Sequence, residues 1–157
     1  SEQFMKSRWF EWPFMVGSLP YLFESGDRAN PTLVLLGNPI VWGLGGAGAL
    51  LGVKRSFESA RRRRRGENAE ERGAVELLSF SYLAYLALFL LFVRRDAFLY
   101  HYFPSLILGV ILFSMLFSEF ADGKTRRVKF WLYFSVISIS FLGFVLIAPF
   151  TYGTAFF

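Results

Sequence analysis

The charged residues of this chain are separated from its apolar residues along the sequence, and this separation constrains the fold more than any other feature. Four apolar runs, at about residues 31–53, 74–93, 104–121 and 130–150, alternate with short segments that hold most of the charges. A soluble domain would spread its charges along amphipathic elements instead. Each run has about the 20 residues that a helix needs to cross a bilayer core of roughly 30 Å. We therefore predict an all-α integral membrane protein with four transmembrane helices.

The positive charge is concentrated in two of the segments between the apolar runs. Residues 54–73 hold eight Lys or Arg, and residues 122–129 hold four. In a four-span chain these two segments lie on the same side, and the bias of cytoplasmic loops toward Lys and Arg places both in the cytoplasm. The N-terminal 30 residues, the loop at 94–103 and the C-terminus are then expected on the extracytoplasmic side.

Five consecutive arginines, at residues 61–65, and a net charge of +5 raise the alternative of nucleic-acid binding. Their position between two apolar runs favours a solvated cytoplasmic loop, with attraction to anionic lipid headgroups as a secondary effect. We therefore expect no nucleic acid among the partners.

The glycines of the first apolar run formally match the dinucleotide fingerprint GxGxxG between Gly43 and Gly48. That motif requires a preceding strand and glycines that open a helix, whereas these lie inside an apolar run. A packing role explains them better, because Gly48 and Gly52 are four residues apart and form, with Gly45, a face of small residues that lets another helix approach closely.

Residue types that carry chemistry are scarce. The chain has no cysteine and one histidine, which excludes disulfides, thiolate metal sites and a histidine metal cluster. Paired carboxylates and a serine nucleophile signature are also missing. We therefore assign no catalytic residue, no metal and no cofactor. Glu76 and Glu119 lie near basic segments, where we expect them to pair or to reach water. No apolar run carries a charge at its middle, which argues against a transporter or channel.

We divide the chain into an N-terminal segment, residues 1–30, and a four-span membrane domain, residues 31–157. The N-terminal segment holds Trp9, Trp12 and other aromatic residues interrupted by Pro and Gly, as expected of a segment at a membrane surface. A loop packed on the rest of the protein is the alternative. Glu11 and the lack of an apolar core before a cleavage site argue against a signal peptide.

A short polar and aromatic segment, residues 94–104, separates the second and third apolar runs and carries the single histidine, His101. Arg94 and Arg95 offer charge-assisted hydrogen bonds that suit a lipid phosphate. His101 can donate to the same anion or transfer a proton. Arginine and histidine at the ends of spans are also common as interfacial anchors. The residues alone therefore indicate either a lipid-headgroup site on the outer face or an anchor.

Three short motifs, read in order, resemble one protein family. They are Ser7-Arg8-Trp9-Phe10-Glu11-Trp12-Pro13, Gly37-Asn38-Pro39-Ile40-Val41-Trp42 and His101-Tyr102-Phe103-Pro104. Their order and their places relative to the four spans look like the C-terminal four-span region of protein O-mannosyltransferases, bacterial versions especially. The resemblance covers nearly the whole chain. In one departure, Gly17-Ser18 stands where the family often has an Arg-Pro step, which weakens a phosphate-directed role for the N-terminal segment.

The resemblance implies a membrane glycosyltransferase that transfers mannose from a polyprenyl or dolichyl phosphate to Ser or Thr hydroxyls. In that family the catalytic acidic residue lies in the first extracytoplasmic loop of a longer chain, a part with no counterpart in this sequence. Donor-side or structural roles follow for Arg94, Arg95, His101 and Tyr102. The implied partners are membrane lipid, polyprenyl-phosphate mannose, and an N-terminal half or other membrane subunits, in a bacterial plasma membrane. The alternative function is a non-catalytic accessory or scaffold subunit of a larger membrane complex.

Overall fold

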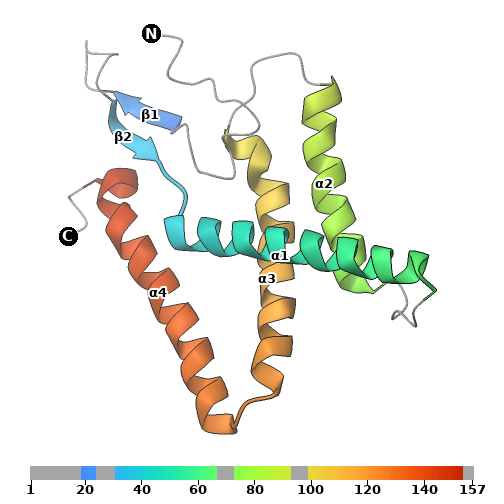
Figure 1. The fold of residues 1–157 in the computed structure, drawn as a ribbon. Coiled ribbons are helices and arrows are strands. Elements are labelled where there is room, and N and C mark those ends of the chain that lie inside the picture. The colour runs from blue at the N-terminus through green and yellow to red at the C-terminus, as the bar shows by residue number, and fades with distance from the viewer. Residues whose placement is uncertain (1–18, 24–30, 67–72, 93–98, 154–157) are drawn as a thin grey trace.

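The computed structural model describes residues 19–23, 31–66, 73–92 and 99–153. Within these residues the chain forms a small antiparallel hairpin and a set of long helices (Figure 1). In chain order the elements are β1 (Leu19–Phe23), β2 (Pro31–Leu35), α1 (Pro39–Arg64), α2 (Ala74–Phe92), the short 3-10 helix η3 (Leu99–Tyr102), α3 (Phe103–Asp122) and α4 (Arg126–Tyr152).

The predicted helical class is confirmed for most of the described chain, and helices occupy the second, third and fourth apolar runs. The hairpin departs from the all-α prediction. Strand β1 falls inside the predicted N-terminal segment, residues 1–30, the rest of which lies outside the described residues. Residues 31–35 form strand β2 and are not part of the first helix. The first motif, at residues 7–13, also lies outside the described residues.

Helix α1 is shifted relative to the predicted first span because its ends are set by local chemistry. Asn38 caps its N-terminus, where the side-chain Oδ1 accepts hydrogen bonds from the backbone N–H groups of Ile40 and Val41 at 3.0 and 3.3 Å. Pro39 fits the first turn of α1, because an N–H at that position would have no partner within the helix and proline has none to lose. At the other end α1 continues to Arg64, and arginines suit the last turn because they interact favourably with the helix dipole. Much of the expected basic loop is therefore helical.

Glycines bring the backbones of α1 and α3 into contact where the two helices cross (Figure 1). A Cβ added to Gly48 would lie 2.3 Å from the carbonyl oxygen of Gly109, and one added to Gly109 would lie 2.4 Å from the carbonyl oxygen of Gly45. Further along α1, a Cβ on Gly52 would lie 2.8 Å from the hydroxyl of Ser79 in α2. The face formed by Gly45, Gly48 and Gly52 thus packs against helices of the same chain.

Helix α4 is joined to this pair through the cap of α1. The Asn38 side-chain amide donates a hydrogen bond of 2.8 Å to the backbone carbonyl of Ser140. A Cβ on Gly143 would lie 2.6 Å from Asn38 Oδ1 and 2.7 Å from Ile40 Cγ1. The start of α1 therefore packs directly against the backbone of α4 at Gly143. Glycine also ends α4, since Gly153 has a φ of 83°, which disfavours residues with a Cβ.

The apolar side chains of α3 and α4 suit a lipid environment. Both helices are long and apolar enough to cross a membrane, and only 6% of the most apolar stretch of α4 is buried. The described apolar part of α2, Ala74–Leu88, is shorter. Such a run of exposed Phe, Leu and Ile would be unusual on a soluble monomer.

Replacing Gly48 by alanine should destabilise the fold by about 1–3 kcal/mol, because the new methyl group meets backbone that cannot move aside without separating α1 from α3. Gly46→Ala is the matched control, since a Cβ at Gly46 meets nothing within 4 Å. Thermal unfolding of the purified chain in detergent, followed by circular dichroism, measures both. Equal unfolding temperatures for the two variants would contradict the tight crossing.

Candidate functional site

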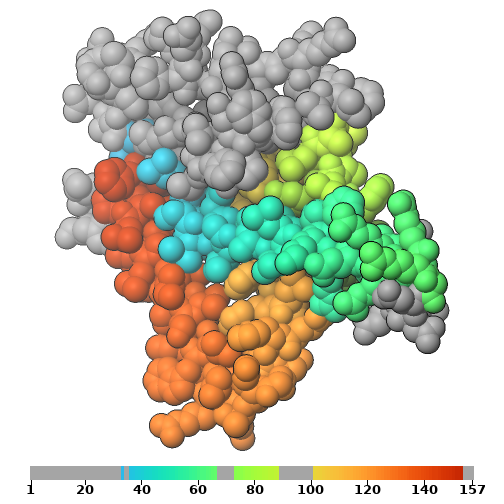
Figure 2. Space-filling model, viewed as in Figure 1, coloured from blue at the N-terminus to red at the C-terminus, as the bar shows by residue number. Residues whose placement is uncertain are grey.

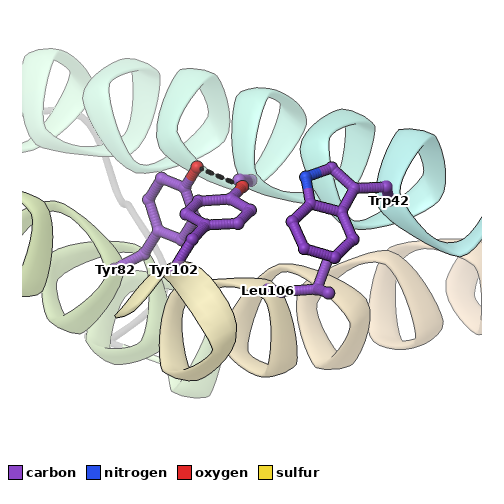
Figure 3. Packing of buried hydrophobic residues seen from close by; sticks show 5 residues of the cluster. Trp42, Tyr82, Tyr102 and Leu106 are labelled. Carbon is purple, nitrogen blue, oxygen red and sulfur yellow. Dashed lines mark hydrogen bonds between the residues drawn. The ribbon is translucent and has the colours of Figure 1, made fainter. Parts of the chain in front are cut away.

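Two of the sequence motifs meet in space, although they lie far apart in the chain. Trp42, at the end of the second motif, is on the first turns of α1, and Tyr102, in the third motif, ends η3. Their ring centroids are 5.5 Å apart, with the planes tilted by 36° (Figure 3). Aromatic pairs at such distances favour tilted over face-to-face geometry. The motif residues are therefore joined by direct packing.

The Trp42–Tyr102 contact is part of a buried group that we call the motif cluster. Its members come from three helices and from η3, and they are Trp42, Ala49, Tyr82, Tyr102 and Leu106.

The hydroxyl groups of Tyr82 and Tyr102 are hydrogen-bonded to each other inside the motif cluster. The Tyr82 and Tyr102 oxygens are 3.0 Å apart (Figure 3), and Tyr102 is 0% exposed. A buried hydroxyl is costly unless it is hydrogen-bonded, so the pairing lets α2 and η3 meet without an unpaired polar atom. The cluster thus contains a polar link between two tyrosines among otherwise hydrophobic residues.

The main chain of His101 is also fixed by a tyrosine of α2. The Tyr85 hydroxyl donates a hydrogen bond of 3.0 Å to the His101 carbonyl oxygen. The next element, α3, begins at Phe103 with Pro104 in its first turn, where proline is tolerated because the turn needs no N–H there. The third motif therefore reads as a short 3-10 turn that leads directly into α3.

The predicted donor-side residues divide into two groups. Arg94 and Arg95 lie outside the described residues. His101 and Tyr102 are consecutive, but their surroundings differ: His101 is half-buried and Tyr102 is enclosed. In this arrangement the Tyr102 side chain has a packing role and does not face a lipid phosphate. The sequence alone does not predict that Trp42 and Tyr82 are neighbours of Tyr102, although Trp42 belongs to the second motif.

Ion pairs join the C-terminal half of α1 to the start of α2 and to the end of α3. Arg63 donates to both carboxylate oxygens of Glu76 at 2.8 Å, a fork geometry that is among the stronger ion pairs. The hydrogen bond with Glu76 raises the pKa of the Arg63 guanidinium further above its ordinary value. Arg55 also pairs with Glu119. Pairing of Glu76 and Glu119 with the basic segment is therefore confirmed.

Among the residues that the structure describes, no group of three or more His, Cys, Asp or Glu is placed to hold a metal ion. What the described site offers chemically is an aromatic and hydrogen-bonded scaffold. It fixes the backbone of His101 immediately after the segment that carries Arg94 and Arg95.

Comparison with known proteins identifies one family. The family model described as "C-terminal four TMM region of protein-O-mannosyltransferase" matches residues 1–156 of the sequence. No curated protein and no solved structure matches the chain.

The hydrogen bond between Tyr82 and Tyr102 should appear in a double-mutant cycle. Tyr102→Phe or Tyr82→Phe alone leaves one buried hydroxyl without its partner and should cost about 1–3 kcal/mol. The double variant removes both hydroxyls and should be no less stable than the worse single variant. Unfolding in detergent provides the measurement. Strictly additive losses would show that the two hydroxyls act independently.

Proposed function

We propose a function for this chain from the family to which it belongs, the C-terminal four-transmembrane region of protein O-mannosyltransferases. In this proposal the chain holds the lipid-linked sugar donor, a polyprenyl-phosphate mannose, at the extracytoplasmic face of the plasma membrane. The transfer of mannose to a Ser or Thr hydroxyl is carried out by an acidic residue from the N-terminal half of such an enzyme.

The observation that carries the proposal is the contact between Trp42 and Tyr102. It joins two motifs typical of the family at one end of α1 and α3, and it anchors the residue that follows His101. Arg94 and Arg95 precede this anchor, Tyr102, by eight and seven residues in the sequence. We therefore propose the phosphate site at Arg94, Arg95 and His101, with Tyr102 as a positioning residue behind it.

The proposed chemistry of the site follows from the charge of the donor. A lipid phosphate accepts charge-assisted and bidentate hydrogen bonds from guanidinium groups, which bind it more strongly than neutral donors do. When the bond between mannose and phosphate breaks, negative charge grows on the departing phosphate. Arg94 and Arg95 would stabilise that charge as well as the bound donor, as fixed positive groups do at developing anions.

The proposed topology has four spans, with both termini outside and the basic segments 54–73 and 122–129 in the cytoplasm of a bacterial cell. The ion pairs support it, because Arg55 with Glu119 and Arg63 with Glu76 bring the C-terminal half of α1 to the end of α3 and the start of α2. These are the ends at which most Lys and Arg residues occur, as expected of a cytoplasmic side. The motif cluster lies toward the other ends of α1 and α3.

A second candidate function is a non-catalytic accessory or scaffold subunit of a larger membrane complex. The exposed apolar side chains of α4 favour it, since they include Phe134, Ile137 and Phe141, and such a face can pack against further membrane helices. The glycine face of α1 gives it no support, because α2 and α3 of the same chain already cover that face.

Binding of polyprenyl phosphate separates the two functions. Arg94→Gln combined with Arg95→Gln should weaken binding of polyprenyl phosphate to the purified chain in lipid nanodiscs by about tenfold or more, because each lost charged hydrogen bond is worth about 1.5–3 kcal/mol. Arg126→Gln with Arg127→Gln removes the same charge near the start of α4 and should leave binding unchanged. Equal binding by the chain and both variants would favour the accessory function.

The division of labour has its own test. Mannosyl transfer to an acceptor peptide should require an added N-terminal half that carries the acidic outer loop. The Arg94 and Arg95 double variant should raise the KM for the donor and lower kcat, because both donor binding and the charge on the departing phosphate lose support. Strong transfer by the purified 157-residue chain alone would contradict this division.

A further inference from the structure

A groove separates the C-terminal half of α1 from the N-terminal half of α2, at the opposite end of α1 from the motif cluster. It has a volume of about 600 Å³. The α1 wall includes Val53, Phe57 and Ala60, and the α2 wall includes Phe80 and Leu83. Figure 2 shows this half of α1 projecting at the surface of the molecule.

The walls of the groove expose large apolar side chains. Phe57 is 59% exposed, Leu77 68% and Phe80 71%. The polar groups at the groove are engaged within the protein: the Ser56 hydroxyl donates to the Gly52 carbonyl at 2.8 Å and the Ser79 hydroxyl to the Val75 carbonyl at 2.7 Å. The groove therefore offers apolar contact to a ligand and few unused hydrogen-bonding groups.

The charge at the groove is partly neutralised inside the protein. Arg63 and Glu76 both line the groove, and they pair with each other. That pair holds α1 against α2. The net charge beside the groove therefore comes from the other arginines at residues 61–65. Across residues 54–73, eight Lys or Arg stand against four Glu, so the segment beside the groove is positive.

Two exposed arginines come one helical turn after residues of α1 that line the groove. Arg61 follows Phe57 by four residues and Arg64 follows Ala60 by four, and both arginines are exposed. Residues four apart lie one above the other on a helix, and their side chains tilt toward its N-terminus. Arg61 and Arg64 therefore lie one turn beyond the lining residues Phe57 and Ala60, at the end of the groove where Arg63 and Glu76 pair.

We propose that this groove binds an anionic phospholipid, with one acyl chain along Phe57, Phe80 and Leu83 and the phosphate held by Arg61 and Arg64. Charge complementarity selects this occupant: an apolar channel that ends in two guanidinium groups matches an acyl chain that ends in a phosphate. An apolar helix of another protein would fill the groove but would leave those two charges unpaired. The site is separate from the proposed donor site, which lies toward the other ends of α1 and α3.

Native mass spectrometry of the full chain in detergent tests the proposal with phosphatidylglycerol and phosphatidylcholine of the same acyl chains. The chain should retain phosphatidylglycerol preferentially. Arg61→Gln with Arg64→Gln should reduce that retention by roughly tenfold to thirtyfold, while Arg63 stays in place to hold Glu76. The matched control, Arg126→Gln with Arg127→Gln, removes the same charge away from the groove and should retain the lipid.

A second variant tests the apolar half of the site without changing any charge. Ala60→Trp places a large ring inside the groove and should also reduce phosphatidylglycerol retention, whereas Leu142→Trp, on the exposed face of α4, should not. Soluble glycerol phosphate should compete poorly, since it lacks the acyl chain. Equal retention of the two lipids, equal loss in both double variants, full competition by glycerol phosphate, or retention by Ala60→Trp would each overturn the proposal.

Discussion

The contact between the backbones of α1 and α3 is the constraint on which the rest of the structure depends. Only glycine lets these helices approach so closely, at Gly48 and Gly109. The short separation allows Trp42 to reach Tyr102 on one side of the crossing and Arg55 to reach Glu119 on the other. A wider spacing would weaken both, so one crossing supports the aromatic end and the charged end of the pair.

The two ends of the helix set are stabilised by different interactions. At one end, apolar burial dominates and the polar links include the pair of Tyr82 and Tyr102 hydroxyls. At the other end, arginines meet carboxylates near the ends of α1, α2 and α3. This division follows the needs of a membrane protein, because charged pairs are tolerated near water and expensive within hydrocarbon. The donor site and the lipid groove that we propose belong to opposite ends, and each uses the chemistry available there.

Much of the helical architecture could be predicted from the sequence, because long apolar runs between charged segments leave few other folds. The ends of α1 could not be placed in the same way. The start of α1 at Pro39 and its continuation through the arginine run depend on local effects, the Asn38 cap and the helix dipole, which hydropathy does not register. The strand at residues 31–35 depends on its pairing with β1. The enclosed position of Tyr102 also depended on tertiary packing, because nothing in its own motif names Trp42 or Tyr82 as partners.

The contact between Asn38, which caps α1, and α4 limits how the sequence can vary at positions 38 and 143. Asn38 fills the space that a side chain at position 143 would occupy, and it also holds the Ser140 carbonyl. Neither position can change freely while the other stays the same: a larger residue at 143 would displace the cap, and loss of the amide at 38 would leave the notch at Gly143 unfilled. In relatives that keep this arrangement, the two positions should therefore vary together, although more than a hundred residues separate them in the chain.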